Sequence, residues 1–132
     1  QPFMICATVE AILAQRLVRR LCVKCREEAR VSADLLFELG MERDQLGDRK
    51  FYRGAGCDAC NNTGYKGRVG LFELMVLNDT IRDMVMSNAS TDEIRAEAQR
   101  GGMITLREFG MGLASEGVTS LEEVVRETIE EG

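Results

Sequence analysis

The sequence predicts an α+β protein, in which a small cysteine-rich subdomain with short strands lies between an N-terminal helix and a C-terminal bundle of short helices. Two Cys-x-x-Cys pairs enclose a loop-rich stretch within residues 22–77, and helix-start signals repeat over residues 78–132. Residues 1–21 carry apolar side chains at helical spacing. Net charge changes along the chain as well, from +3 over residues 1–30 to −1 over residues 31–77 and −7 over the remainder. We therefore expect three structural pieces.

The first piece is predicted to be an amphipathic helix. Arg16, Arg19 and Arg20 would form its cationic face, which is most simply a solvated surface. The alternative is that one of these arginines binds an anion or a neighbouring subunit. The apolar face would be formed by residues recurring every three or four positions, namely Val9, Ile12, Leu13, Leu17, Val18 and Leu21.

Short elements are predicted in the middle piece. Ser32 can cap a helix over residues 34–39, and Gly40 can end it. Residues 50–53 are predicted to form a strand, and residues 69–77 (VGLFELMVL) a second one. Because this second strand is apolar at odd and even positions alike, we expect both of its faces to be buried.

Glu73 is the lone charge in that apolar strand. A buried carboxylate needs a cation or hydrogen-bond donors, or else it stays protonated. Arg68 falls on the opposite face of the strand. The partner of Glu73 is therefore expected to come from another segment, for example Arg16 or Arg20.

The last piece contains four helix starts. Each has a polar residue that can cap the first turn, and three of these are followed by a glutamate that completes a capping box. The expected helices have narrow apolar stripes and acidic outer faces, which predicts a small bundle with a solvated acidic exterior. The four starting residues are Asp79, Ser90, Thr105 and Ser120.

The cysteines carry the strongest functional signal. Cys22 and Cys25 form one pair, Cys57 and Cys60 form the other, and 31 residues separate the two pairs. Together they supply four thiolates for a tetrahedral site, so a structural Zn²⁺ is predicted. Closing the intervening loop costs about 3 kcal/mol of chain entropy. A structural zinc contributes roughly 10–16 kcal/mol of apparent binding energy, which exceeds that cost.

Glycines surround the second pair. Gly54, Gly56 and Gly64 are expected to provide the positive φ angles that the turns of such zinc knuckles use. Cys6 lies in an apolar run and is most simply a buried small hydrophobic residue.

Other uses of the paired cysteines remain open. Disulfides are disfavoured, because nothing in the sequence indicates export. Iron held by four thiolates would use the same ligands. An iron-thiolate electron carrier is therefore an alternative to a structural zinc site.

Several activities are excluded or disfavoured by composition. The chain has no histidine, which removes the usual general base and every Ser-His or Cys-His nucleophile pair. It also has no GxxxxGK[ST] phosphate-binding loop. An acidic chain with 5% aromatic residues lacks the basic, aromatic surface of most nucleic-acid binders. No apolar stretch is long enough for direct membrane insertion.

Three runs of the sequence carry a resemblance to a known family. They are PFMICATVEAILAQRLVRRLC (residues 2–22), GCDACNNTGYKGRVGLFELM (residues 56–75) and GGMITLREFGMGLASEGVTSLEEVVRET (residues 101–128). In this order they resemble the C-terminal third of the type II secretion and type IV pilus assembly ATPases. A fainter likeness links residues 57–67 to a zinc repeat of J-domain co-chaperones, which need about four such repeats.

The family resemblance implies a division of the chain. Residues 1–21 would be the last helix of a RecA-like ATPase core, residues 22–77 an inserted tetracysteine subdomain, and residues 78–132 a C-terminal helical subdomain. The chain opens with Gln1 rather than Met, so we expect it to be part of a longer protein.

The same resemblance implies a function for the parent protein. It would be a hexameric motor that hydrolyses ATP with Mg²⁺ at the cytoplasmic face of the bacterial inner membrane. It would drive secretion or pilus assembly through an inner-membrane platform protein, and we expect residues 22–77 to dock onto that partner. The nucleotide-binding motifs of the family precede this segment, so the chain alone is expected to be catalytically inactive.

Overall fold

The computed structural model describes residues 10–128 and has the predicted α+β class. Its strands are β1 (Ala11–Leu21), β2 (Arg26–Ala29), β3 (Phe51–Gly54) and β4 (Tyr65–Val76). Its helices are α2 (Ala33–Leu39), α3 (Asp79–Met86), α4 (Thr91–Arg100), α5 (Leu106–Ser115) and α6 (Leu121–Glu127), with short 3₁₀ turns at η1 (Arg43–Leu46) and η2 (Asp58–Cys60). None of these helices is both long and apolar enough to cross a membrane.

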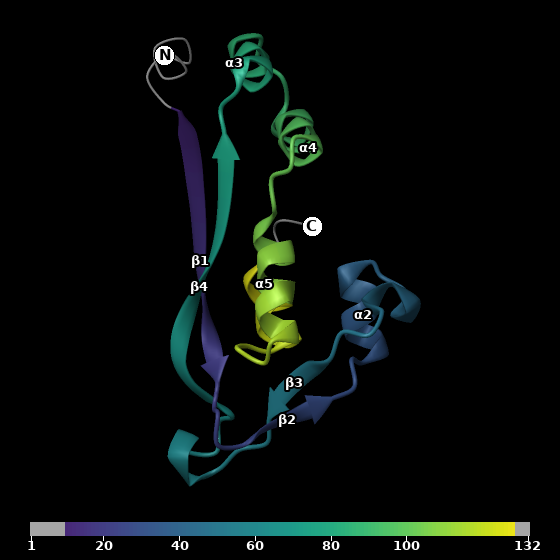
Figure 1. The fold of residues 1–132 in the computed structure, drawn as a ribbon, viewed down its shortest axis with the longest axis vertical. Helices are drawn as coiled ribbons and strands as arrows, with labels where there is room; N and C mark the ends of the chain where they lie inside the picture. The colour runs from purple at the N-terminus through teal and green to yellow at the C-terminus, as the bar shows by residue number, and fades with distance from the viewer. Residues whose placement is uncertain (1–9, 129–132) are drawn as a thin grey trace. The chain divides into compact units, whose positions relative to one another are not determined.

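Strand β1 replaces the helix predicted at the N-terminal end of the chain. It pairs with β4, and the two strands run in opposite directions (Figure 1). At one end of the pair Cys22 N–H donates to the Gly64 carbonyl, and at the other end Leu77 N–H donates to the Glu10 carbonyl, both at 2.9 Å. The helix prediction is wrong over residues 11–21 because pairing with this distant strand outweighs the local apolar spacing. The rest of that prediction lies outside the described residues.

Strand β4 is present as predicted, but it is not buried on both faces. Leu71 and Glu73 are buried, whereas the alternating residues Phe72, Leu74 and Val76 are 40%, 52% and 61% exposed. The strand therefore follows the inside-outside alternation of a sheet that is covered on one side. A continuous apolar run cannot distinguish this arrangement from a fully buried strand.

By contacts the chain divides into two compact units. Unit 1 contains Phe72–Thr105 and the segment that ends at Gln15, and unit 2 contains Arg16–Leu71 and the segment that begins at Leu106. The division into residues 1–21, 22–77 and 78–132 that the sequence suggested stays a prediction.

Unit 1 contains helices α3 and α4 and its own small core. The Asn78 side chain accepts a hydrogen bond from Ile81 N–H at 2.8 Å, so α3 begins one residue after its cap, at Asp79. Ser90 and Glu93 form the predicted capping box at the start of α4. The buried residues of this core are Leu77, Ile81 and Ala98, and Met75, Met84, Val85, Ile94 and Met103 pack against them.

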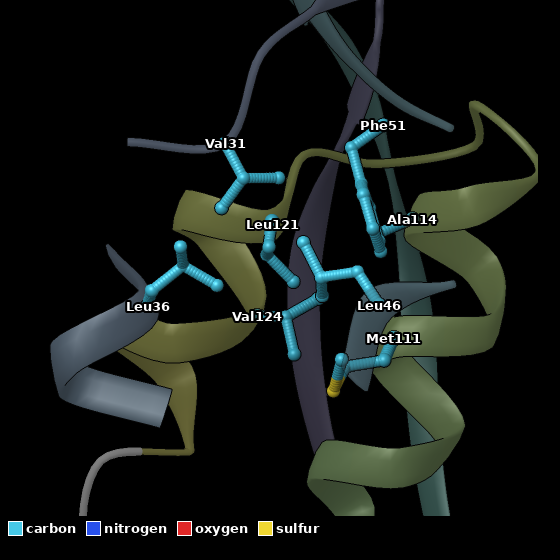
Figure 2. Close-up of a cluster of buried hydrophobic side chains, with 8 residues drawn as sticks. All are labelled: Val31, Leu36, Leu46, Phe51, Met111, Ala114, Leu121 and Val124. Atoms are coloured by element: carbon cyan, nitrogen blue, oxygen red, sulfur yellow. The ribbon is translucent and has the colours of Figure 1, made fainter. Parts of the chain in front are cut away.

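Unit 2 contains the four paired cysteines and is built around a core that joins segments distant in the sequence. Strands β2 and β3 pair antiparallel, with Arg26 opposite Gly54 and Ala29 opposite Phe51. Ser32 caps α2 and Gly40 ends it with φ of 67°, both as predicted. Figure 2 shows the core side chains from this region converging with those of α5 and α6: Val31, Leu36, Leu46, Phe51, Met111, Ala114, Leu121 and Val124.

Candidate metal centre

The four paired cysteines come together in unit 2. Their sulfur atoms all lie within 4.8 Å of one another. The Sγ atoms of Cys22 and Cys57 are 3.7 Å apart, and those of Cys25 and Cys60 are 3.8 Å apart. A tetrahedral zinc site with Zn–S bonds of about 2.3 Å has sulfur–sulfur edges of about 3.8 Å. The observed spacing therefore fits a metal of this size and coordination.

The first knuckle is the turn between β1 and β2. Cys22 follows the last residue of β1, and its carbonyl accepts hydrogen bonds from the backbone N–H groups of Cys25 (3.4 Å) and Arg26 (3.0 Å). This turn brings the two sulfurs of the pair to the same side. The knuckle is held at both ends, because β1 pairs with β4 and β2 pairs with β3.

The second knuckle is built around η2. The Cys57 carbonyl accepts hydrogen bonds from Cys60 N–H (3.2 Å) and Asn62 N–H (2.8 Å). Asn61 and Asn62 take positive φ angles of 56° and 61°, a conformation that asparagine tolerates better than most residues. The turn thus depends on two asparagines that the sequence analysis did not single out.

Backbone N–H groups point at two of the sulfurs. Gly64 N–H donates to Cys60 Sγ at 3.2 Å, Cys57 N–H donates to the same atom at 3.4 Å, and Gly56 N–H donates to Cys25 Sγ at 3.3 Å. These donors stabilise thiolates, and metal-bound thiolates commonly have such outer partners.

The glycines near the second knuckle serve two different purposes. Gly56 and Gly64 have φ of 98° and 83°, as predicted. Gly54 does not take a positive φ, so that part of the prediction is wrong. A Cβ atom at Gly54 would lie 2.1 Å from the Gly64 carbonyl oxygen. Gly54 is therefore required for a close approach of two backbones.

Two of the thiols have strongly shifted pKa values. Burial raises the pKa of Cys60, but the N–H donors from Cys57 and Gly64 act in the opposite direction and bring it down to about 6. The pKa of Cys25 is raised to about 12, chiefly by burial, although Gly56 N–H opposes the rise. The Cys25 thiol therefore keeps its proton at neutral pH, and a cation that binds this sulfur must displace it.

The candidate metal centre is partly exposed. Cys22 and Cys60 are 1% and 5% exposed, whereas Cys25 and Cys57 are only partly buried. Within residues 10–128 no other group of three or more potential metal-ligating side chains comes together. Cys6 lies outside the described residues. Metal binding by these four residues stays a prediction that their geometry favours.

A second polar cluster in unit 2 was missed by the sequence analysis. The Glu123 carboxylate, on α6, accepts hydrogen bonds from the Arg19 guanidinium (2.7 Å) and from the Arg19 backbone N–H (2.9 Å). The same guanidinium lies 4.0 Å from the centre of the Tyr65 ring, and the Tyr65 hydroxyl is 2.6 Å from the hydroxyl of Ser120. Thr119 donates to the Arg19 carbonyl at 2.7 Å. The cluster thus fixes α6 against β1 and β4 next to the first knuckle.

The capping prediction at α6 is confirmed only in part. Ser120 accepts from Glu123 N–H at 3.1 Å, as a cap should. The Glu123 side chain, which would complete a capping box, instead contacts Arg19 and Arg126. Nothing local in the sequence indicates this, because Arg19 and Glu123 are 104 residues apart.

Glu73 has the cationic partner that its burial requires. The Arg95 guanidinium, from α4 in unit 1, contacts both carboxylate oxygens at 2.7 and 3.2 Å. The expectation of an arginine from another segment is confirmed. The sequence analysis offered Arg16 or Arg20 as examples and did not name Arg95.

Comparison with known proteins gives a consistent result. A family model described as Type II/IV secretion system protein matches residues 1–126. The chain is 43% identical over 98% of its length to a type IV pilus assembly ATPase PilB of Thermus thermophilus, and covers 15% of that relative. It is 37% identical over 99% of its length to a type II secretion system protein E of Aeromonas hydrophila, and covers 26% of it. The chain thus spans about a quarter or less of these relatives.

Proposed function

Because this chain belongs to the type II/IV secretion system protein family, we propose that it is the zinc-binding C-terminal part of an ATP-driven secretion or pilus-assembly motor. The observation that carries the proposal is the four-sulfur cluster in unit 2, whose sulfur atoms all lie within 4.8 Å of one another. A site with four thiolates has no open position for a substrate, so its metal stabilises structure. The chain contributes rigidity and a binding surface to the motor.

Zinc is the metal that the proposal assigns to Cys22, Cys25, Cys57 and Cys60. Zinc and iron both accept four thiolates, and the spacing of the sulfurs suits either. A protein that folds around the site has no need of redox chemistry there, which favours zinc over an electron-carrier role. Elemental analysis and colour separate the two, because iron-thiolate protein is red and zinc protein is colourless.

The parent protein is proposed to be a hexamer that binds ATP and Mg²⁺ through residues outside this chain. It would work in the cytoplasm at the inner membrane, held there by its partners. The inner-membrane platform protein of the secretion or pilus machinery would be the partner of residues 22–77, because binding functions concentrate on surface loops held by a rigid scaffold.

Two exposed apolar side chains support a docking role for this segment. Phe37, on α2, is 86% exposed, and Val23, in the first knuckle, is 71% exposed. Removing apolar side chains of this size from water lowers the free energy, so a partner that covers them is bound more tightly.

The docking proposal is tested in the full-length parent protein with Phe37→Ser. We expect bound metal and basal ATPase activity to stay at wild-type levels while secretion or piliation falls. Met86→Ser is the matched control, since Met86 is also exposed but lies in α3, outside residues 22–77. Wild-type assembly by the Phe37→Ser protein would overturn docking through this surface.

A further inference from the structure

Unit 2 contains a cavity with an unusual concentration of positive charge. The cavity has a volume of about 400 Å³ and lies between the end of β2, the η1 turn and the start of β3. Arg30, Arg43, Arg49 and Lys50 line it, and Glu28 is the lone acidic residue of its lining. The chain as a whole has a net charge of −5, so this concentration of cations is a local feature.

Two of these arginines are held in place without being neutralised. Arg43 donates to the Val31 carbonyl at 2.9 Å. Arg49 donates to the carbonyls of Leu46 (3.0 Å) and Gln45 (3.1 Å). Backbone carbonyls orient a guanidinium but leave its full charge, so both side chains retain N–H donors for an anion.

The remaining cations are also available to a ligand. Glu28 is 3.8 Å from Lys50, and both side chains are more than half exposed, a geometry that contributes little binding energy. Arg30 is exposed and makes no ion pair with any carboxylate of the described residues.

The floor of the cavity is apolar and continues into a second, neighbouring cavity. Val31, Leu46 and Phe51 line it and are among the buried core residues of unit 2. A second cavity of about 120 Å³ shares Ala29, Arg30, Val31 and Phe51 with the first. Its other charged lining residues are Arg53, which is already paired with Glu27 at 2.8 Å, and Glu122. The apolar floor therefore continues from the first cavity into the second, and the cations that are free for a ligand line the first.

We propose that this site binds an acidic peptide segment of a partner protein, with carboxylates on the arginines and an apolar side chain against the floor. A single phosphate would need donors that converge on one point, whereas the guanidinium groups of Arg43 and Arg49 are held by carbonyls of different segments, at Val31 and at the η1 turn. Arginine forks match carboxylates, and a cavity of this size accommodates a few residues of peptide. The inference deepens and rests on the proposed docking function, because it states the chemistry of the segment that docks.

The test is fluorescence polarisation with the metal-loaded 132-residue chain. The probe is a short fluorescein-labelled peptide that alternates Glu with Leu. We expect the Arg30→Glu, Lys50→Glu double variant to bind it about tenfold or more weakly, because two attractive contacts become repulsive. Lys66→Glu is the matched control, since Lys66 is exposed in the same unit and lines another cavity. Metal content and circular dichroism verify that each variant is folded.

A second measurement does not depend on any variant. In the wild-type chain, the probe should shift the amide NMR resonances of Val31 and Phe51 and leave those of α5 unchanged. Equal binding by wild type and double variant, or no shift at Val31 and Phe51, would overturn the proposal. Displacement of the probe by equimolar pyrophosphate would also overturn it, in favour of a phosphate site.

The outcomes separate this inference from the docking function. If Phe37→Ser leaves assembly intact in the parent while the probe still binds at the cavity, docking through the Phe37 surface is overturned, whereas binding of an acidic peptide at the cavity is supported. If the probe does not bind while Phe37→Ser blocks assembly, the docking function is supported, and the proposal that the cavity binds an acidic segment is wrong.

Discussion

At the scale of single residues, Glu123 joins the last helix to the first strand through one buried carboxylate. Its side chain is 3% exposed and contacts the guanidinium groups of Arg19 and Arg126 at 2.7 and 2.6 Å. Burial alone would raise the pKa of Glu123, but the hydrogen bonds from Arg19 and the charge of Arg126 lower it below its usual value. The folded protein therefore favours the ionised form.

We expect Glu123→Gln to lower the free energy of unfolding at pH 7 by about 2–3 kcal/mol. The amide keeps the shape of the carboxylate but loses the charge that Arg19 and Arg126 contact. Urea denaturation of the metal-loaded protein measures the loss. Glu122→Gln is the control, because Glu122 is exposed on the same helix, and it should change stability by less than about 0.5 kcal/mol.

The pH dependence of this loss follows from the direction of the pKa shift. A carboxyl group with a lowered pKa in the folded state stabilises the protein above its unfolded pKa of about 4.3. That stabilisation disappears as the pH falls through the folded-state pKa. The difference between wild type and Glu123→Gln should thus be constant near neutrality and shrink in acid. A difference that stays constant down to the acid limit would contradict the ionic role of Glu123.

The cysteine site gives a second prediction at this scale. Wild-type protein expressed with ample zinc should contain about one zinc per chain, and Cys57→Ser should lose it because three thiolates leave the tetrahedron incomplete. Elemental analysis of purified protein measures both. Cys6→Ser should leave the zinc content unchanged. Substoichiometric zinc in the wild type, or iron in its place, would refute the assignment.

At the scale of elements, helix α5 contacts its neighbours at a position where only glycine fits. A Cβ atom at Gly110 would lie 2.7 Å from Val124 Cγ1 and 3.1 Å from Leu71 Cδ1. The small residue lets α5 approach α6 and β4 closely enough to close the core of unit 2. Gly112 lies on the same helix, but a Cβ there would meet nothing within 4 Å.

This pair of glycines gives a matched prediction. Gly110→Ala should destabilise the protein by about 1–3 kcal/mol, because overpacking outweighs the gain in helix propensity. Gly112→Ala should stabilise it by up to about 1 kcal/mol, because only the propensity gain remains. Urea denaturation of the two variants beside the wild type measures the contrast. Similar effects of the two substitutions would mean that the contact at Gly110 is not tight.

The same elements show what sequence can predict and what it cannot. The caps at Ser32, Ser90 and Ser120 are local, since each contacts a backbone group three residues away, and their helices were predicted. The cysteine cluster was predicted because its chemistry fixes the ligand number. Strand β1 was mistaken for a helix because the spacing of its apolar residues gives no information about its pairing with the distant strand β4. The Arg19–Glu123 contact was missed for the same reason.

At the scale of the whole chain, the proposed function assigns these 132 residues a binding and stabilising role and places ATP hydrolysis elsewhere in the parent. No histidine and no phosphate-binding loop occur in the 132 residues. We expect the purified chain to show no ATP hydrolysis above a buffer blank, because it has no phosphate-binding loop to position the phosphates and no histidine to act as the general base. A malachite-green phosphate assay checks this. Turnover that persists through further purification would contradict the proposal that catalysis lies elsewhere in the parent.

Metal removal tests how the cysteine centre is coupled to the two units. The core of unit 2 combines Val31 and Phe51, which flank the knuckles in the sequence, with Leu121 and Val124 of α6. Loss of the metal should therefore loosen α5 and α6 as well as β2 and β3, because the same core holds all four elements. Unit 1 has a separate core around Ile81. Its helices α3 and α4 should keep their protection.

Hydrogen exchange with mass spectrometry, before and after treatment with a zinc chelator, measures this difference. The expected result is fast exchange in peptides from β2, β3, α5 and α6, with near-native protection in those from α3 and α4. Zinc added back should restore protection, which separates metal loss from irreversible damage. Equal loss of protection in both units would show that the chain unfolds as one cooperative body, and unchanged protection throughout would mean that the metal does not stabilise the fold.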